Sequence, residues 1–236
     1  MPLPKIEHPT FDLTLPASKQ VVKLRPFLVK EEKILLMAIQ SDENAEMVSA
    51  IKQVINNCIM EGDVDVETLP TIDLEYMFIK LRARSVNNII KLTYRDLEDD
   101  KKYNVEVNLD EVEVRHNPEH TTKLIINKKL TIEMRYPRVS ITNELASINT
   151  STDFFFNVLK SCIDKINYDK NTYLVSESTV EELDEFLNSL DVNAFEKLQK
   201  FFTTMPKLHY EVKYTNSLGN ERVIVLSSLT DFFTLG

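Results

Sequence analysis

The stretch from Asp191 to Phe233 reads DVNAFEKLQKFFTTMPKLHYEVKYTNSLGNERVIVLSSLTDFF. Asp191 is suited to cap a helix, and the apolar residues after it recur at helical spacing until Pro206 ends the helix. Apolar and polar residues then alternate on both sides of the polar turn Asn216–Asn220, which predicts a β-hairpin. The stretch therefore predicts a compact helix–hairpin unit, and it holds no catalytic constellation.

The composition limits the classes of function. The chain has 236 residues, of which 43% are hydrophobic and 28% are charged, and its formal net charge is −9. This apolar content is enough for a folded core. Because nucleic acid and anionic membrane surfaces are bound mainly through Lys and Arg, neither is an expected partner of so acidic a chain. The apolar runs are too short to cross a bilayer and no signal peptide is visible, so we expect a soluble protein that is intracellular when made.

Small and reactive residues exclude several kinds of site. The chain has 3 glycines, too few and too dispersed for a phosphate-binding loop. We expect Cys58 and Cys162, both in apolar helical contexts, to be buried hydrophobes rather than a disulfide or a nucleophile. His116 and His120 would share one face of a helix as metal ligands, but Pro118 between them favours a solvated loop pair.

Hydrophobic periodicity predicts the remaining elements. We expect Asp73 to cap one helix and Ser178 to form a capping box with Glu181 at another. The predicted helices span residues 30–40, 45–60, 73–84, 151–166, 180–187 and 191–205. The predicted strands span residues 11–15, 21–24, 89–94, 103–109, 112–114, 124–126 and 130–134, before those of the final hairpin.

These elements predict an α+β fold. Two helical clusters would flank a small antiparallel β-sheet, and the chain would close with a C-terminal β-hairpin. We expect an N-terminal α+β region over residues 1–140 and a C-terminal helical region with the hairpin over residues 141–236, because residues 138–149 are polar and lack a clear period. One joined fold is an equal alternative, and no internal repeat stands out.

The acidic clusters Asp96–Asp100 and Glu177–Glu185 do not predict catalysis. General acid–base chemistry needs two acids held across a pocket with separated pKa values, which neighbouring acids in a turn or on a helix face do not provide. We interpret both clusters as solvated surface, or as a complement to a basic partner. We therefore expect no enzymatic activity, no small-molecule substrate and no cofactor.

The candidate docking residues are basic or aromatic. A basic group at the end of the third helix either caps that helix or offers a handle to an acidic neighbour. The aromatic pair Phe232 and Phe233 either packs on its own domain or inserts into a partner. The docking hypothesis covers Lys80, Arg82, Arg84, Phe201, Phe202, Phe232 and Phe233.

Four segments carry a resemblance to a known family. They read KLRPFLVKEEKILLMA (23–38), IKQVINNC (51–58), DLEYMFIKLRARS (73–85), and residues 195–206 together with LTDFF (229–233). In their order and spacing they resemble the baseplate hub proteins of T-even-like contractile-tailed bacteriophages. The resemblance covers both ends of the chain, and the middle strands contribute less to it.

The resemblance implies a late phage protein located in the tail baseplate of the virion and made in the host cytoplasm. Its partners would be other phage tail and baseplate proteins. It would be either a structural hub subunit or a transient assembly chaperone that leaves the particle. Some members of the resembled family carry a cysteine pair in the final hairpin, similar to a small zinc ribbon; Thr215 and Leu218 stand there in this chain, so we expect no metal.

Overall fold

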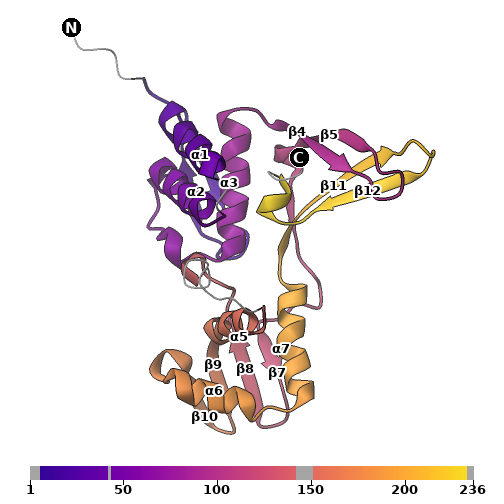
Figure 1. Ribbon diagram of the computed structural model, residues 1–236. Helices are drawn as coiled ribbons and strands as arrows, with labels where there is room; N and C mark the ends of the chain where they lie inside the picture. Colours follow the sequence, from indigo (N-terminus) through magenta and orange to yellow (C-terminus); the bar gives the residue numbers. More distant parts are fainter. Residues whose placement is uncertain (1–5, 42–43, 142–150, 233–236) are drawn as a thin grey trace. The chain divides into compact units, whose positions relative to one another are not determined.

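The computed structural model describes residues 6–41, 44–141 and 151–232. It has the expected α+β class, with helices and several small antiparallel sheets (Figure 1). Contacts divide the chain into two compact units: unit 1 comprises residues 1–115 and 207–236, and unit 2 comprises residues 116–206. The expected division after residue 140 differs from these units, because the final hairpin packs with the first half of the chain.

The N-terminal part of unit 1 combines three helices with a three-stranded antiparallel sheet of order β1-β2-β3. Its elements are β1 (Phe11–Thr14), β2 (Val21–Leu24), α1 (Val29–Ser41), α2 (Asn44–Cys58), β3 (Ile59–Glu61), the 3-10 turn η1 (Val66–Thr68) and α3 (Thr71–Ser85). The helix expected to reach residue 60 ends at Cys58, because the next residues pair with β2 as a strand.

Contrary to the expectation from the sequence, Asp73 does not cap α3. Pro70 precedes the helix, and the fully buried Asp73 carboxylate accepts hydrogen bonds from the backbone N–H groups of Ala17 (2.7 Å) and Ser18 (2.8 Å). This side chain therefore fixes the β1–β2 turn on α3, a contact between residues distant in sequence.

Two β-hairpins complete unit 1 (Figure 1). The first comprises β4 (Ile89–Arg95) and β5 (Lys102–Asn108), followed by the 3-10 turn η2 (Leu109–Glu111) and by β6 (Glu113–Arg115). The second comprises β11 (Lys207–Thr215) and β12 (Glu221–Leu226), followed by the 3-10 turn η4 (Leu229–Phe232). β6 pairs with the start of β11, so the expected single middle sheet is divided among separate ladders.

The two hairpins and α3 share one apolar core. Its buried residues are Ile72, Ile79, Leu92, Val105, Val107, Leu109, Val112, Leu208, Val212, Ile224, Leu226 and Phe232. Burying side chains of this size stabilises a fold by roughly 1.5–3 kcal/mol each. Neither hairpin could supply this burial alone, because a two-stranded hairpin has no second layer.

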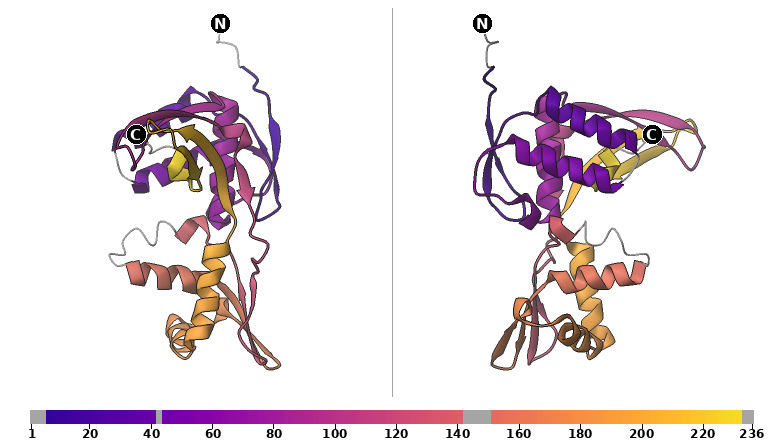
Figure 2. Two further views of the ribbon diagram at one scale, coloured as in Figure 1. Left: turned by 90° about the vertical axis from the view of Figure 1, so that its right-hand side faces the viewer. Right: turned by 60° about the vertical axis from the view of Figure 1, so that its left-hand side comes forward.

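Unit 2 packs helices on one face of a four-stranded antiparallel sheet of order β10-β9-β8-β7 (Figure 2). Its strands are β7 (Lys123–Ile125), β8 (Leu130–Met134), β9 (Ile163–Tyr168) and β10 (Asn171–Leu174). Its other elements are α5 (Ser151–Cys162), the 3-10 turn η3 (Val175–Glu177), α6 (Val180–Asn188) and α7 (Val192–Thr204). The helix expected over 151–166 ends at Cys162, since Ile163 and Ile166 are drawn into the sheet beside β8.

Helix caps in unit 2 follow the sequence closely. Asp191 caps α7 as expected, accepting from the N–H of Ala194 at 2.8 Å. The capping box of α6 is formed by Thr179 and Glu182, one residue later than the predicted pair. Among the helices that the structure describes, none has the length and apolar character needed to cross a membrane.

Candidate docking residues and the hairpin clasp

Phe201 and Phe202 lie in the core of unit 2. Phe201 is 1% exposed, and the two rings meet edge to face with centroids 5.2 Å apart. Phe202 is half-buried and also contacts Phe155. Phe201 therefore stabilises the unit and has no surface to offer a partner in this conformation.

Phe232 takes the first of the two alternatives expected for the terminal aromatic pair. It is 1% exposed and belongs to the shared core of the two hairpins. Phe233 lies outside the described residues. Of the described aromatic residues named from the sequence, Phe201 and Phe202 thus belong to the core of unit 2 and Phe232 to that of unit 1.

The basic residues of α3 mostly face their own unit. Lys80 Nζ donates to the backbone carbonyls of Leu109 (3.3 Å) and Asp110 (2.7 Å), at the end of the first hairpin. The Arg84 guanidinium lies over the ring of Phe11, 4.2 Å from its centroid. Burial lowers the pKa of Arg82, which is only partly exposed. These contacts show a structural use of two of the three cations.

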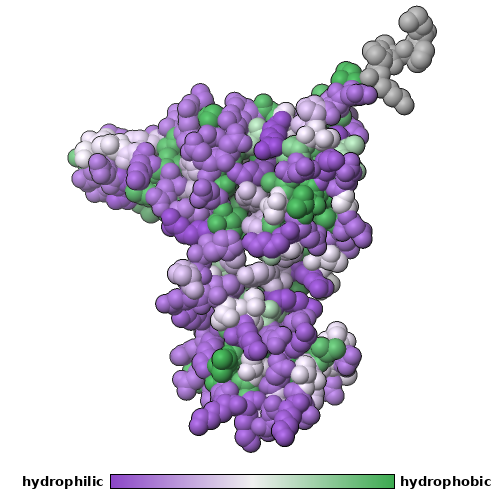
Figure 3. Space-filling model, turned by 180° about the vertical axis from the view of Figure 1, so that it is seen from behind, coloured by the Kyte–Doolittle hydropathy of each residue, from purple (hydrophilic) through white to green (hydrophobic). Residues whose placement is uncertain are grey.

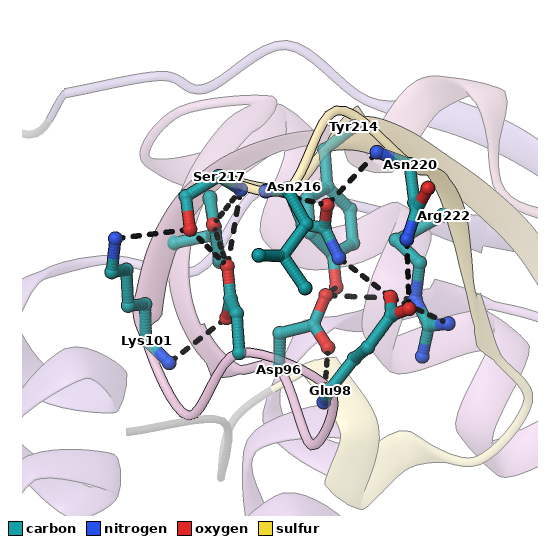
Figure 4. A network of polar contacts seen from close by, with 11 residues as sticks. Asp96, Glu98, Lys101, Tyr214, Asn216, Ser217, Asn220 and Arg222 are labelled. Carbon is teal, nitrogen blue, oxygen red and sulfur yellow. Dashed lines mark hydrogen bonds and ion pairs between the residues drawn. The ribbon is translucent and has the colours of Figure 1, made fainter.

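The acidic turn Asp96–Asp100 is solvated only in part: Asp100 is exposed and pairs with Arg95 of its own hairpin at 2.7 Å, whereas Asp96 is fully buried. The carboxylates of Asp96, Glu98 and Asp99 face the other hairpin at its polar turn Asn216–Asn220 (Figure 4). We call this set of contacts the clasp, defined by the segments Tyr94–Tyr103 and Tyr214–Arg222. Sequence reasoning identified both turns but missed their pairing; the signal was chemical, since one turn is rich in carboxylates and the other in amide and hydroxyl donors.

Asp96 and Glu98 form one half of the clasp. The fully buried Asp96 accepts from the Tyr214 hydroxyl at 2.6 Å, while Glu98 accepts from the side-chain amides of Asn216 and Asn220, each at 2.7 Å. Arg222 approaches both acids, with its Nε 3.5 Å from Asp96 and a terminal nitrogen 3.3 Å from Glu98. One cation therefore serves two carboxylates whose remaining oxygens accept from neutral donors.

Asp99 forms the other half. Its carboxylate accepts from the Tyr103 hydroxyl and from Ser217, whose backbone N–H and Oγ lie at 3.1 Å and 2.8 Å. Lys101 Nζ donates to the same Ser217 Oγ at 2.9 Å. The clasp thus joins the two turns through several mutually supporting hydrogen bonds.

Burial and hydrogen bonds in the clasp shift the pKa values of Asp96, Asp99 and Tyr214 away from neutrality. The hydrogen bond from Tyr214 lowers the pKa of Asp96, and burial together with that bond raises the pKa of Tyr214 to about 12. Burial alone would raise the pKa of Asp99, but hydrogen bonds from Tyr103, Lys101 and Ser217 outweigh it and lower the pKa. Such groups do not exchange protons near neutral pH, which a general acid or base must do.

Glu75 of α3 titrates closer to neutrality. Burial, with a smaller contribution from Asp231, raises its pKa to about 7 despite a hydrogen bond from the backbone N–H of Leu229. The Asp231 carboxylate accepts from the N–H groups of Ser227 (2.8 Å) and Ser228 (2.9 Å). The two acids thus hold the backbone of the C-terminal 3-10 turn.

One histidine of the expected solvated pair, His120, is not solvated as expected. His116 is exposed, whereas His120 is half-buried against Tyr136, at a centroid distance of 5.6 Å, and its Nδ1 lies 2.9 Å from Thr204 Oγ1. In the part of the chain that the structure describes, no three His, Cys, Asp or Glu side chains gather in a way that could hold a metal ion. His120 therefore packs in unit 2 as an aromatic residue.

The outward face of α1 carries apolar residues that nothing in the described structure covers. Leu36, Met37 and Ile39 are 50%, 62% and 57% exposed. The helix turns Glu31, Leu35 and Ala38 inward instead. The buried Glu31 carboxylate accepts a hydrogen bond from Arg25 at 3.0 Å.

The site residues are thus buried aromatics, polar turns bonded to each other and an exposed apolar face of α1. The chain belongs to the T4 bacteriophage base plate protein family, whose model matches residues 8–234. No curated protein and no solved structure matches it. The family implies a place in the virion tail and contacts with other phage tail proteins, and structural baseplate families typically lack enzymatic activity. The resemblance inferred from the four segments is confirmed at the level of the family.

Proposed function

We propose that this chain is a structural or assembly component of the central hub of a contractile phage tail baseplate, where it acts by docking on other tail proteins. The observation that supports docking most directly is the apolar outer face of α1, within a family of baseplate proteins. Figure 3 shows one side of the molecule, where apolar residues interrupt a largely hydrophilic surface.

The α1 face suits a protein contact on energetic grounds. Leu36 lies about two turns after Val29 on the same side of α1, and Met37 is the next residue around the helix; all three side chains are exposed. Fully burying each such side chain contributes roughly 1.5–3 kcal/mol. Lys30 and Lys33, also exposed on this helix, could add charge steering toward an acidic partner.

Of the residues suggested by the sequence, Phe202, Lys80, Arg82 and Arg84 are at least partly exposed, and a docking role for them stays a prediction. Phe201 and Phe232 act in the cores, because their side chains are inaccessible. The docking surface would then consist mainly of α1 and of the exposed parts of Lys80, Arg82 and Arg84.

A double variant tests the proposal. Leu36→Gln with Met37→Gln replaces exposed apolar residues with polar helix formers, so the fold should be kept while binding is lost. Co-purification of tail proteins from infected cells with the tagged chain should fall at least tenfold, the effect of about 1.4 kcal/mol. Val180→Gln, which alters a residue 62% exposed on α6, is the matched control and should bind normally. Unchanged recovery with the double variant would contradict docking through α1.

The alternative is a transient assembly chaperone, which would cover apolar surface on a tail protein and then leave. Quantitative mass spectrometry of purified intact particles separates the two roles. A fixed stoichiometry with other baseplate proteins supports the hub subunit, whereas presence in assembly intermediates and absence from particles supports the chaperone.

A further inference from the structure

We infer that the chain is a tandem duplication of one module, and that the terminal hairpins of the two copies pair with each other through equivalent residues. The first copy spans residues 11–112 and the second spans residues 123–232. Both contain, in order, a hairpin, a helix that ends in a cysteine, a strand that joins the hairpin, a 3-10 turn, a helical segment, a second hairpin and a final 3-10 turn; the first also has α1 before that helix, and the second has β10 after that strand. In both, the strand after the cysteine pairs antiparallel with the second strand of the first hairpin.

The helix-to-strand junctions agree in detail. In the first junction the N–H of Arg25 donates to the carbonyl of Cys58 (3.0 Å), and in the second the N–H of Arg135 donates to the carbonyl of Cys162 (2.7 Å). Each arginine side chain also donates to the carbonyl of the residue before the cysteine, at 2.9 Å and 2.8 Å respectively.

Two further features of the junctions correspond. The register of the strand pair shifts just before each arginine, between Lys23 and Leu24 and between Glu133 and Met134. The local sequences are VINNCI (54–59) and VLKSCI (158–163), which agree in three of six positions. Shared irregularities of this kind point to common descent more strongly than shared regular elements do, because bulges are specific features of a fold.

The turns of the terminal hairpins share several features, although the first turn is one residue longer than the second. In the first, the Asp96 side chain accepts from the N–H of Glu98, and Asp100 has φ of 58°. In the second, the Asn216 side chain accepts from the N–H of Leu218, and Gly219 has φ of 87°. Each turn is closed by the N–H of its Asp or Asn, which donates to the carbonyl of the residue after the left-handed one.

Equivalent positions of the hairpins also meet in space. Tyr94 and Tyr214, each two residues before its turn's Asp or Asn, touch with ring centroids 6.1 Å apart. The core residues of the first hairpin, Leu92, Val105, Val107 and Val112, correspond to Val212, Ile224, Leu226 and Phe232 of the second, and all are buried in one cluster. Each hairpin therefore supplies the apolar layer that the other lacks.

Helix α3 holds both copies of the final 3-10 turn through backbone groups. Lys80 donates to carbonyls of η2, and Glu75 accepts from the N–H of Leu229 in η4. Because these contacts involve backbone atoms, they do not depend on which hairpin occupies which place. The tips of the two hairpins, residues 94–103 and 214–222, lie outside both 3-10 turns, so exchanging the tips leaves these contacts of α3 in place.

The test exchanges the clasp segments in the full chain. One variant swaps residues 94–103 (YRDLEDDKKY) and 214–222 (YTNSLGNER) reciprocally; two single-replacement variants carry either segment in both places. All contacts of the clasp join these two segments, so the reciprocal variant keeps every partner if the hairpins are equivalent. The single variants place carboxylates against carboxylates, or amides against amides.

We expect the reciprocal variant to unfold at the same denaturant concentration as the parent chain. Both single variants should unfold at lower concentrations. A modest loss in the reciprocal variant still supports the inference if that variant unfolds at a higher denaturant concentration than either single variant. A reciprocal variant that is no more stable than the single variants would overturn it. This outcome is independent of the proposed baseplate function, because it is read from unfolding of the purified chain.

Discussion

The two junctions share their backbone bonds but differ in where their acid lies. In the first junction Arg25 pairs with Glu31 at 3.0 Å, and the Glu31 side chain is 0% exposed. In the second, Arg135 pairs with Asp164 at 3.5 Å, and the Asp164 side chain is 42% exposed. The same architecture therefore holds a buried ion pair in one copy and a hydrated one in the other.

The burial of the carboxylate therefore determines how much stability each junction would lose without its arginine. A buried carboxylate needs its cation, because water cannot replace it. Glu31 also accepts from the N–H of Leu28 at 2.9 Å, so it ties the start of α1 to the first junction. Asp164 can lose its partner and remain solvated.

The largest expected effect comes from Arg25→Met. The variant removes the hydrogen-bonded cation of the buried Glu31, which keeps only the exposed Lys30 at 3.4 Å, and this should reduce the free energy of unfolding of unit 1 by about 3 kcal/mol. Urea denaturation of the full chain, followed by circular dichroism, measures this loss. In the control, Glu31→Leu is added to Arg25→Met and should recover part of the stability; if it recovers none, the buried charge is not the cause.

Acidification should reduce the difference in free energy of unfolding between the Arg25→Met variant and the parent chain. Burial alone would raise the pKa of Glu31, but hydrogen bonds from Arg25 and Leu28 outweigh it and hold the pKa below its ordinary value. In the parent this contribution is present above the unfolded pKa of about 4.5 and is lost as pH falls through the lower folded value. Without Arg25 burial dominates, so the variant should gain stability as Glu31 becomes protonated on acidification. Denaturation midpoints compared at pH 7 and pH 4.5 check this, and a constant gap would contradict it.

The smallest effect is expected from Arg135→Met. It removes one side-chain hydrogen bond at the second junction and should cost about 1 kcal/mol. Thiol labelling reads each unit separately, because Cys58 lies in unit 1 and Cys162 in unit 2. Both side chains are fully buried, and burial raises the pKa of each thiol to about 11, so labelling requires the unit to open. At pH 8 labelling of Cys162 should become about fivefold faster, the effect of about 1 kcal/mol on opening. Labelling of Cys58 in the same sample is the internal control, and an equal acceleration there would show that the junctions are not independent.

The sequence predicted most elements because their signals are local. The periodic helices, the turn at Asn216–Asn220 and the Asp191 cap each depend on residues close together in the chain. Errors occurred where a distant segment competed with the local pattern. Ile163 and Ile166 continue an apolar helical face, yet strand β8 draws them into a sheet.

The candidate sites were harder to predict, because exposure is a tertiary property. Aromatic side chains such as Phe201 and Phe232 suit either a core or an interface, and only the packing of the fold shows that both are buried. Leu36 shows the reverse case: it is an apolar residue of α1 and is 50% exposed, while the charged Glu31 of the same helix is buried. The sequence does not reveal the duplication, because the two copies share hydrogen-bond patterns and bulges more than they share residue types.

By itself, the sequence determined the α+β class, the order of most helices and strands, and membership of a phage baseplate family, because periodicity, capping and segment order are written along the chain. Only the tertiary structure decided which residues meet. It joined Asp96 to Tyr214 and Glu31 to Arg25, and it left the face of α1 open. The physical reason is that burial and hydrogen-bond pairing depend on segments that are distant in sequence and are brought together only by the shared core.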